Sequence, residues 1–429
     1  KLGLNTKKDV LNYGVDKFNA LCRSDVFTFI GSWNTLTERM AFWIDLKNPY
    51  VTLENEYIES VWWSLQQLHR KGLLYEDFKV LPYCPRCETP LSSHEVALGY
   101  EDITEPAITT MFQLKDNPNR YFLAWTTTPW TTPGNVALAV HPDVVYAVVE
   151  DNAYPGKQFV LANDLVAKYF SNPIIVQTLT GSELEGKEYV PLFDCFVDKL
   201  DKPAWFITLA GFVTTDEGTG IVHQAPAFGE EDYENCKKHN LPFVQPVGED
   251  GKFTKDVEDF AGLFVKEADP LIVERLEKDG LLFRKENYTH SYPFCWRCST
   301  PLVYYALRSW FIAVSRFKDR LLELNEKISW YPDNIKHGRF GDWLTNVKDW
   351  TLSRSRFWGT PLPIWKCNSS SCNGEVAVGS IKELKEKSVH PLKNDAVDLH
   401  KPFIDEIKLK CPVCSGEMSR VPYVIDCWY

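Results

Sequence analysis

Apolar residues near the start of the chain recur at intervals of three and four, which is the spacing of one face of an α-helix. The run ends near Lys71-Gly72, where a cation and a glycine are typical of a helix C-terminus. The repeating positions are Tyr57, Ile58, Val61, Trp62, Leu65 and Leu68. We therefore expect residues 1 to about 80 to form a helical scaffold.

Between about residue 100 and residue 285 the pattern changes to short β-rich runs separated by turn residues. These runs span 121–127, 144–149, 173–179, 205–213 and 221–225. They predict a compact β-barrel-like domain with a few helices. Helical spacing returns around 317–324 and 340–347, and an apolar strand is expected at 424–428. The expected fold class is mixed α/β.

Composition and charge narrow the class of protein. The chain has 429 residues, 44% apolar and 14% aromatic, which is enough for the cores of two or three domains. No stretch approaches the roughly 20 apolar residues that cross a bilayer, and no signal segment argues for secretion, so we expect a cytoplasmic protein without a membrane partner. The formal charge of −11 argues against coating nucleic acid by charge alone, so any RNA contact must use a local basic face.

Eight of the twelve cysteines fall into four close pairs. The pairs are Cys84/Cys87, Cys295/Cys298, Cys367/Cys372 and Cys411/Cys414. A C-x-x-C knuckle directs two thiolates at one point, and two knuckles complete a tetrahedral zinc site, so two structural zinc ions are expected. The C-x-x-x-x-C spacing of Cys367/Cys372 is a looser knuckle. Redox or disulfide chemistry is the alternative, but catalytic dithiols usually occur once per domain and disulfides need an oxidising compartment.

Position along the chain indicates which pairs share an ion. The last two pairs lie within one short segment and should form a zinc ribbon. The first two pairs are about two hundred residues apart and bracket the β-rich region. Because an inserted domain needs its two ends close together, a shared zinc ion would clamp them there.

Two polar motifs stand out inside the β-rich region. Residues 125–135 read Trp-Thr-Thr-Thr-Pro-Trp-Thr-Thr-Pro-Gly-Asn. Proline fixes its own φ and favours extended geometry before it, so the three consecutive threonines form a rigid rim of donors and acceptors. In residues 218–232 a glycine-flanked strand offers His223, and a helix start offers Asp232. These groups suit a pocket that holds an ammonium group and a ribose beside an ester.

Each of these residues also has an ordinary structural explanation. Threonines where a strand ends are often satisfied by local hydrogen bonds. An isolated histidine is more often a core residue than a functional one, and an acid in the first turn is favoured by the helix macrodipole. Trp130 can equally be a core residue.

The two motifs together resemble the editing site of the isoleucyl-tRNA synthetases, which are class I aminoacyl-tRNA synthetases. The valyl and leucyl families carry arginine, in Thr-Thr-Arg-Pro, where this chain has Thr128. The resemblance runs essentially from end to end, through the motifs at 83–87, 292–301 and 349–361. It implies hydrolysis of mischarged Val-tRNA(Ile), because a hydrophobic pocket discriminates only weakly against one missing methylene.

The resemblance also implies a role for each motif residue. The catalytic residues would be Thr127, Thr128 and Asp232, and the substrate-binding residues Thr126, Trp130 and His223. The threonines of the family contact the terminal adenosine and the aminoacyl ester, and its histidine lines the side-chain pocket. Asp232 would hold the α-ammonium group as an ionised carboxylate, a task that needs no raised pKa, and a role as general base is the alternative. The family carries zinc at positions matching both cysteine sets.

Class I synthetases carry a His-Ile-Gly-His-type signature early and a Lys-Met-Ser-Lys-Ser-type loop late, and this sequence contains neither. We therefore expect an internal part of a longer enzyme, with ATP and Mg²⁺ used only by the full-length enzyme. The expected segments are 1–98, helical edge of a Rossmann-type catalytic core with the first zinc knuckle; 99–288, editing domain; 289–365, second knuckle and return to the core; 366–422, zinc ribbon; and 423–429, start of a core strand.

The expected partners are the aminoacylated 3′ end of tRNA(Ile), valine and isoleucine, and a monomer is expected. Two other functions compete with this reading. One is the editing region of a valyl- or leucyl-tRNA synthetase, which Thr128 disfavours. The other is a non-catalytic zinc-ribbon module that only binds tRNA. Loss of Asp232, His223 or the threonines would favour the silent module, and all of them are present.

Overall fold

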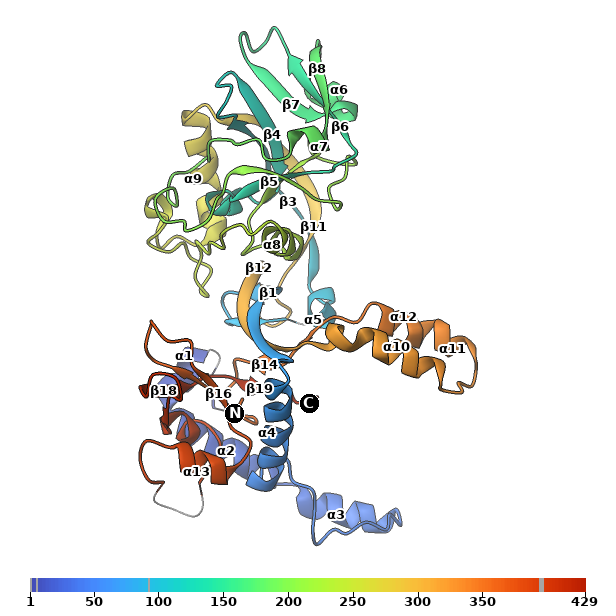
Figure 1. The fold of residues 1–429 in the computed structure, drawn as a ribbon, viewed down its shortest axis with the longest axis vertical. Helices are drawn as coiled ribbons and strands as arrows, with labels where there is room; N and C mark the ends of the chain where they lie inside the picture. Colours follow the sequence, from blue (N-terminus) through green and yellow to red (C-terminus); the bar gives the residue numbers. More distant parts are fainter. Residues whose placement is uncertain (1, 5–6, 92, 393–396) are drawn as a thin grey trace. The chain divides into compact units, whose positions relative to one another are not determined.

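The structure is a computed structural model in which residues 2–4, 7–91, 93–392 and 397–429 are described (Figure 1). The chain divides into two compact units, one made of Lys1–Phe78 with Arg308–Tyr429 and the other of Lys79–Leu307. In sequence, the second unit is therefore an insertion in the first. The chain enters the insertion along β1 (Leu74–Cys84) and leaves it along β12 (Val303–Ile312).

The first unit begins with helices, as the apolar spacing predicts. Helix α4 (Asn55–Arg70) buries its apolar stripe, including Trp62 and Leu65, in two neighbouring cores. It ends at the predicted place, followed by Gly72 with φ +64°. Because β1 starts at Leu74, the expectation of helix to about residue 80 is wrong in its last part. The other helices of the unit are α1 (Lys7–Tyr13), α2 (Val15–Val26), α3 (Ile30–Arg39), η4 (Val314–Phe317), α10 (Lys318–Glu326), α11 (Asn334–His337), α12 (Arg339–Thr345), α13 (Ile381–Lys387) and η5 (Phe403–Glu406).

Short antiparallel strands complete the first unit. A four-stranded sheet has the order β16-β15-β18-β17, and β14 pairs with β19. The strand expected at 424–428 is confined to two residues. The Asp426 N–H still bonds the Leu352 carbonyl at 2.7 Å, and its carboxylate pairs with Arg354 at 2.6 Å. The strands are β13 (Trp350–Thr351), β14 (Ser353–Arg354), β15 (Ile364–Cys367), β16 (Glu375–Ala377), β17 (Leu409–Lys410), β18 (Glu417–Arg420) and β19 (Val424–Ile425).

The second unit is built on two sheets, with strand orders β11-β3-β4-β7-β6-β8 and β10-β5-β9 (Figure 1). All five predicted runs contain a strand. In the run at 205–213 the strand is shorter than expected: it starts after Trp205, which has φ +61°, and ends at Leu209. The strands are β2 (Thr89–Pro90), β3 (Tyr100–Gln113), β4 (Arg120–Thr126), β5 (Ala137–Val140), β6 (Val145–Glu150), β7 (Gln158–Ala162), β8 (Ile174–Thr180), β9 (Phe206–Leu209), β10 (Ile221–Gln224) and β11 (Leu282–Pro293).

Helices line the sheets of the second unit, and α9 contacts the turn η1 and strand β11. Apolar side chains of β4, β6 and β7 form one core of this unit, which includes Leu123, Val149 and Phe159. The mixed α/β class is confirmed. The helices are α5 (Ser93–Ala97), η1 (Pro129–Gly134), η2 (Asn163–Leu165), α6 (Val166–Tyr169), α7 (Gly181–Leu184), α8 (Glu230–Lys238), η3 (Glu258–Phe260) and α9 (Val265–Lys278). Within the described ranges, no helix combines the length and apolarity that crossing a bilayer requires.

Candidate hydrolytic site and cysteine clusters

The threonine motif joins the end of β4 to the 3₁₀ turn η1 and is linked by its own hydroxyls. The Thr126 Oγ1 accepts a hydrogen bond from the Thr128 N–H at 3.1 Å and also lies 3.1 Å from the Thr128 Oγ1. The Thr128 Oγ1 lies 3.2 Å from the Thr131 Oγ1, which donates to the Thr128 carbonyl at 2.8 Å. A continuous line of hydroxyls therefore runs from the strand into the turn.

Thr127 differs from its two neighbours. Its side chain is half-buried, and across the described part of the chain its hydroxyl has no hydrogen-bond partner. The hydroxyls of Thr126 and Thr128 are already engaged in the internal line. Thr127 is thus the member of the triplet whose hydroxyl is left to meet a ligand.

His223, on β10, stands at the inner end of this line of hydroxyls. Its Nε2 lies 2.9 Å from the Thr131 Oγ1, and its Nδ1 lies 3.0 Å from the Asn135 Nδ2. An amide nitrogen can only donate, so Nδ1 is the acceptor and Nε2 carries the proton. The Thr131 oxygen can accept a hydrogen bond from the His223 Nε2–H, because the Thr131 hydroxyl donates its own hydrogen to the Thr128 carbonyl.

Burial makes this histidine neutral as well as fixed in its tautomer. The side chain is 8% exposed, and burial lowers the pKa of His223 to about 4. The Asn135 amide is itself oriented, because its Oδ1 accepts a hydrogen bond from the Tyr189 hydroxyl at 2.7 Å. At neutral pH both ring nitrogens are occupied, so His223 has no free lone pair with which to act as a base.

Three members of this network were not identified as site residues from the sequence. Thr131 and Asn135 lie in the threonine motif, and the helical turn that aligns Thr131 with Thr128 places residues three apart on one side. Recognition of that turn would have found Thr131. Tyr189 carries no local signal, because it reaches Asn135 from 54 residues away.

Asp232 is the third residue of α8, as its motif predicts, and it folds back onto β10. Its Oδ1 accepts from the Gln224 Nε2 at 2.9 Å and its Oδ2 from the Ala225 N–H at 3.0 Å. Gly229 caps the helix, and a Cβ there would lie 2.8 Å from the Asp232 Cγ. Asp232 is therefore fixed to the strand that carries His223, whereas the described hydrogen bonds do not join it to Thr126, Thr127 or Thr128.

The charge state of Asp232 differs from the sequence expectation of an ordinary, ionised carboxylate. Burial raises the pKa of Asp232 to about 7, although the hydrogen bonds from Ala225 and Gln224 oppose the rise. Near neutral pH the free site therefore holds a mixture of carboxylic acid and carboxylate.

Trp130 lies inside the unit with 2% of its surface exposed. Its ring meets Phe228 edge-on, with centroids 4.7 Å apart. Its indole N–H is buried without a partner among the described residues. Trp130 is thus part of the packed wall behind the threonines, and contact with a substrate remains a prediction.

The first predicted set of cysteines comes together in the second unit. The Sγ atoms of Cys84, Cys87, Cys295 and Cys298 all lie within 4.8 Å of one another. The Cys298 Sγ is 3.5 Å from those of both Cys84 and Cys87, far longer than a disulfide bond and close to the edge of about 3.8 Å in a tetrahedral zinc–thiolate site. The predicted pairing of the two distant knuckles is confirmed.

The second set meets in the same way in the first unit. The Sγ atoms of Cys367, Cys372, Cys411 and Cys414 also lie within 4.8 Å of one another, with two separations of 3.4 and 3.8 Å. A Cβ at Gly374 would lie 2.5 Å from the Cys411 Sγ, so the backbone is close around the sulfurs. Both sets offer four thiolates and can hold a metal ion.

Comparison with known proteins decides the family. The model of a family described as "tRNA synthetases class I (I, L, M and V)" matches residues 1–429. The chain belongs to the class I tRNA synthetases. Similar members of this family include proteins named isoleucine–tRNA ligase from Thermus thermophilus (50% identical), Clostridium acetobutylicum (48%) and Thermoplasma volcanium (47%). Each match covers the whole chain, which spans 40% of the length of each of these synthetases.

A solved structure described as "The crystal structure of GlLeuRS-CP1" is also similar in part. It covers 43% of this synthetase chain and 100% of its own, with 15% identity and a TM-score of 0.32. A superposition this loose adds nothing to the family assignment.

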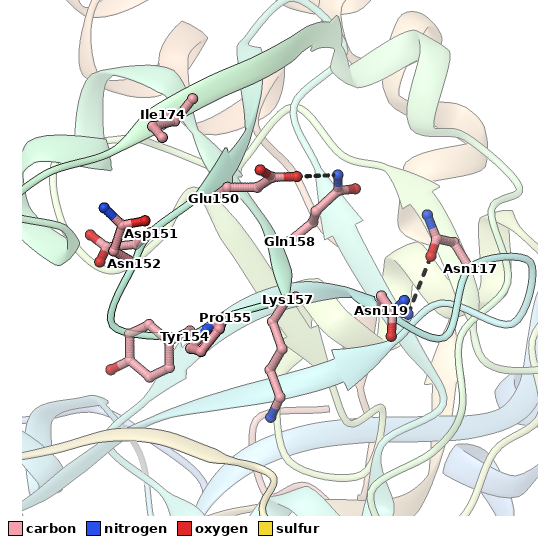
Figure 2. A pocket seen from close by; sticks show the side chains of 11 residues that line it. Asn117, Asn119, Glu150, Asp151, Asn152, Tyr154, Pro155, Lys157, Gln158 and Ile174 are labelled. Atoms are coloured by element: carbon pink, nitrogen blue, oxygen red, sulfur yellow. Dashed lines mark hydrogen bonds between the residues drawn. The ribbon is translucent and has the colours of Figure 1, made fainter.

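A polar cavity of about 380 Å³ lies at the other end of β4 from the threonines (Figure 2). Figure 2 shows hydrogen bonds between Glu150 and Gln158 and between Asn117 and Asn119. The Gln158 Nε2 donates to the Glu150 Oε1 at 2.8 Å, and the Asn119 N–H donates to the Asn117 Oδ1 at 3.2 Å. Asn119 precedes the first residue of β4, whereas Thr126 is its last, so the length of the strand separates the two places. The cavity is not part of the site that contains the synthetase's threonine motif.

Proposed function

We propose that the inserted unit hydrolyses valine from mischarged tRNA(Ile), as the editing part of an isoleucine–tRNA ligase. One observation carries the proposal. The line of hydroxyls from Thr126 to Thr131 ends on a neutral His223, and Asp232 is bonded to Gln224 and Ala225, the two residues that follow His223 in the chain. The isoleucine–tRNA ligases at 47–50% identity support the specificity, as does Thr128 in place of the arginine of the valyl and leucyl families.

The hydrogen bonds restrict what each residue contributes to ester hydrolysis. Both nitrogens of His223 are engaged, so it shapes the pocket and does not activate water. The Thr127 hydroxyl, which is left without a partner in the described structure, can donate to the carbonyl oxygen as negative charge develops there. Thr128, whose hydroxyl contacts those of Thr126 and Thr131, holds the backbone next to Thr127 in place. The vicinal ribose hydroxyl of the substrate is close to the same ester.

Asp232 is suited to binding the α-ammonium group of the aminoacyl ester. With a pKa of about 7, Asp232 is partly protonated near neutral pH, and an approaching cation favours its ionised form. Substrate binding and ionisation of Asp232 are therefore coupled. The resulting charge-assisted contact orients the ester against the threonines.

The remaining assignments follow the same family. We assign structural Zn²⁺ to both cysteine sets, because four thiolates close a tetrahedral site and leave no position for catalysis. ATP and Mg²⁺ would serve only the longer enzyme, which joins isoleucine to its tRNA. Paired free thiols at ligand spacing favour a reducing compartment, and we place the protein in the cytoplasm as a monomer.

Deacylation of Val-tRNA and Ile-tRNA, both made with tRNA specific for isoleucine, tests the proposal. The assay uses the 429-residue chain and the full-length enzyme in parallel. We expect Val-tRNA to be hydrolysed faster than Ile-tRNA, and the chain alone to give no isoleucine-dependent ATP–pyrophosphate exchange. Equal rates on the two aminoacyl-tRNAs would contradict the specificity, and no hydrolysis by the full-length enzyme would contradict the reaction.

A further inference from the structure

The turn η1, which carries Thr131, starts without a cap of its own. The first N–H groups of a helical turn have no partner inside it, and the side chain of the preceding residue commonly accepts one of them. Here that residue is Thr128, and its side chain makes no capping bond. Its hydroxyl faces Thr126 and Thr131 instead. Pro129 has no N–H, and the Thr131 N–H already bonds the Thr128 carbonyl at 3.0 Å. At the start of the turn it is therefore the Trp130 N–H that needs an acceptor from elsewhere.

Asp269, on α9, supplies that acceptor. Its Oδ1 accepts a hydrogen bond from the Trp130 N–H at 2.8 Å, although the two residues are 139 apart in the sequence. Asp269 is only 7% exposed, and Trp130 is still more buried. The cap is thus a buried contact between two elements that the chain itself does not hold together.

A charged cluster holds Asp269 in place. The Lys266 Nζ lies 3.9 Å from the Asp269 Oδ2 and 2.7 Å from the Glu105 Oε2 on β3, and it sits over the Tyr292 ring on β11 with a centroid distance of 4.7 Å. The other oxygen of Glu105 lies 3.0 Å from the His290 Nε2. The Lys266 and Glu105 side chains are 17% and 14% exposed, so solvent screens this pair little. The cluster ties α9 to two strands.

The cap does not depend on the charge of Asp269. Burial raises the pKa of Asp269 to about 7, and Lys266 and the Trp130 N–H oppose the rise. With the proton on Oδ2, the Oδ1 atom still accepts from Trp130. The contact therefore persists in both protonation states.

We propose that Asp269 is a positioning residue of the hydrolytic site, which caps η1 from α9 and thereby frees the Thr128 hydroxyl for the line that reaches His223. The inference rests on the proposed editing function. Asp269 does not touch the substrate in this arrangement. It acts through Trp130, whose backbone sets where Thr128 and Thr131 stand.

Two variants that keep the branched, four-atom side-chain skeleton of Asp separate the acceptor from the space it fills. Asp269→Leu removes the acceptor, whereas Asp269→Asn keeps an oxygen for the Trp130 N–H. In the full-length enzyme we expect Asp269→Leu to lower kcat for Val-tRNA deacylation by about tenfold to a hundredfold, because small displacements of positioned groups are costly. KM should stay within about threefold, and Asp269→Asn should keep kcat within about threefold. Glu267→Ala, an exposed acid on the same helix, is the matched control and should match the unmodified enzyme.

Amide hydrogen exchange over residues 125–135 gives a readout that is independent of catalysis. We expect faster exchange in Asp269→Leu and normal exchange in Asp269→Asn and Glu267→Ala, with all three folded by thermal melting. A folded Asp269→Leu enzyme with the unmodified rate overturns the proposal, and so does an Asn variant as slow as the Leu variant.

Two further outcomes remain decisive. If Asp269→Leu does not fold, Asp269→Ala replaces it. If neither variant folds, Asp269→Asn decides alone. A lower kcat in Asp269→Asn with normal amide exchange over residues 125–135 then overturns the positioning role. An unmodified enzyme that does not hydrolyse Val-tRNA contradicts the proposed function. Amide exchange then still decides whether Asp269 holds the turn.

Discussion

The Asn135 amide nitrogen lies 3.0 Å from the His223 Nδ1, and this contact assigns the single ring proton of the histidine to Nε2. A donor at Nδ1 and burial act in the same direction, because both favour the neutral ring. The histidine is consequently a fixed hydrogen-bond donor to Thr131. The protonation state of His223 is therefore set by Asn135 and by burial.

Replacing Tyr189 with phenylalanine should destabilise the second unit. Tyr189→Phe leaves the buried Asn135 Oδ1 without its hydroxyl donor, and an unsatisfied buried acceptor costs ~1–3 kcal/mol. Chemical unfolding of the purified chain measures the loss. Tyr288→Phe is the control, because the Tyr288 hydroxyl bonds Glu217 at the surface and should change stability little. Equal effects of the two substitutions would contradict the role of Tyr189.

Acid should weaken the fold through His223. The folded pKa of about 4 lies below the ordinary value of 6.5, so the folded state binds fewer protons between these values. The contribution of His223 to the free energy of unfolding is fully present above pH 6.5. It is lost as the pH falls towards 4, by on the order of 3 kcal/mol.

Asp232 and Asp269 have the opposite pH dependence. Their pKa values are raised to about 7, so their contribution to the free energy of unfolding is lost as the pH rises towards 7.

Comparison with a variant isolates the contribution of His223 to the pH dependence of stability. The unfolding free energies of the unmodified chain and of His223→Gln are measured from pH 4 to pH 7. The advantage of the unmodified chain over the variant should shrink as the pH falls. A difference that is constant across this range would show that His223 is not buried neutral.

Loss of the Asp232 carboxylate should remove most of the hydrolysis of Val-tRNA. A charge-assisted contact contributes ~1.5–3 kcal/mol, so Asp232→Ala should slow deacylation by roughly tenfold to over a hundredfold while the unit remains folded. Glu234→Ala changes an exposed acid on the same helix and should have little effect. For the unmodified enzyme, kcat/KM should rise as the pH passes about 7, because the carboxylate then predominates in the free site.

Shortening His223 should weaken the discrimination against isoleucine. His223→Ala removes a buried ring from the expected side-chain pocket, and the added space should admit Ile-tRNA. We expect deacylation of Ile-tRNA to accelerate relative to deacylation of Val-tRNA. Unchanged selectivity in a folded variant would place the side-chain pocket elsewhere in the unit.

Metal analysis of the native chain should find two equivalents of zinc. Cys298→Ser and Cys414→Ser should each remove one, because they open different tetrads. Structural zinc sites contribute an apparent ~10–16 kcal/mol, so a chelator should lower the melting temperature markedly. Less than one equivalent in native protein would contradict both assignments.

Local patterns revealed the two cysteine sets, because C-x-x-C spacing directs thiolates at one point whatever surrounds them. Sequence patterns also predicted helix α4 and the strand Ile221–Gln224. They did not predict the raised pKa of Asp232, because that pKa depends on burial by distant chain segments. The Tyr189–Asn135 and Asp269–Trp130 bonds join residues 54 and 139 apart, and nothing near either residue indicates its partner.

The tight space at Gly229 turns one position into a marker for related sequences. Any side chain there would press on Asp232, whose two oxygens are already held by Gln224 and Ala225. A homologue that keeps the aspartate and the histidine but replaces this glycine should therefore have a displaced carboxylate. Under the proposed editing function, such a chain would keep the polar residues of the site and yet tolerate mischarged tRNA, so the residue at this position is worth reading before activity is assigned to a relative.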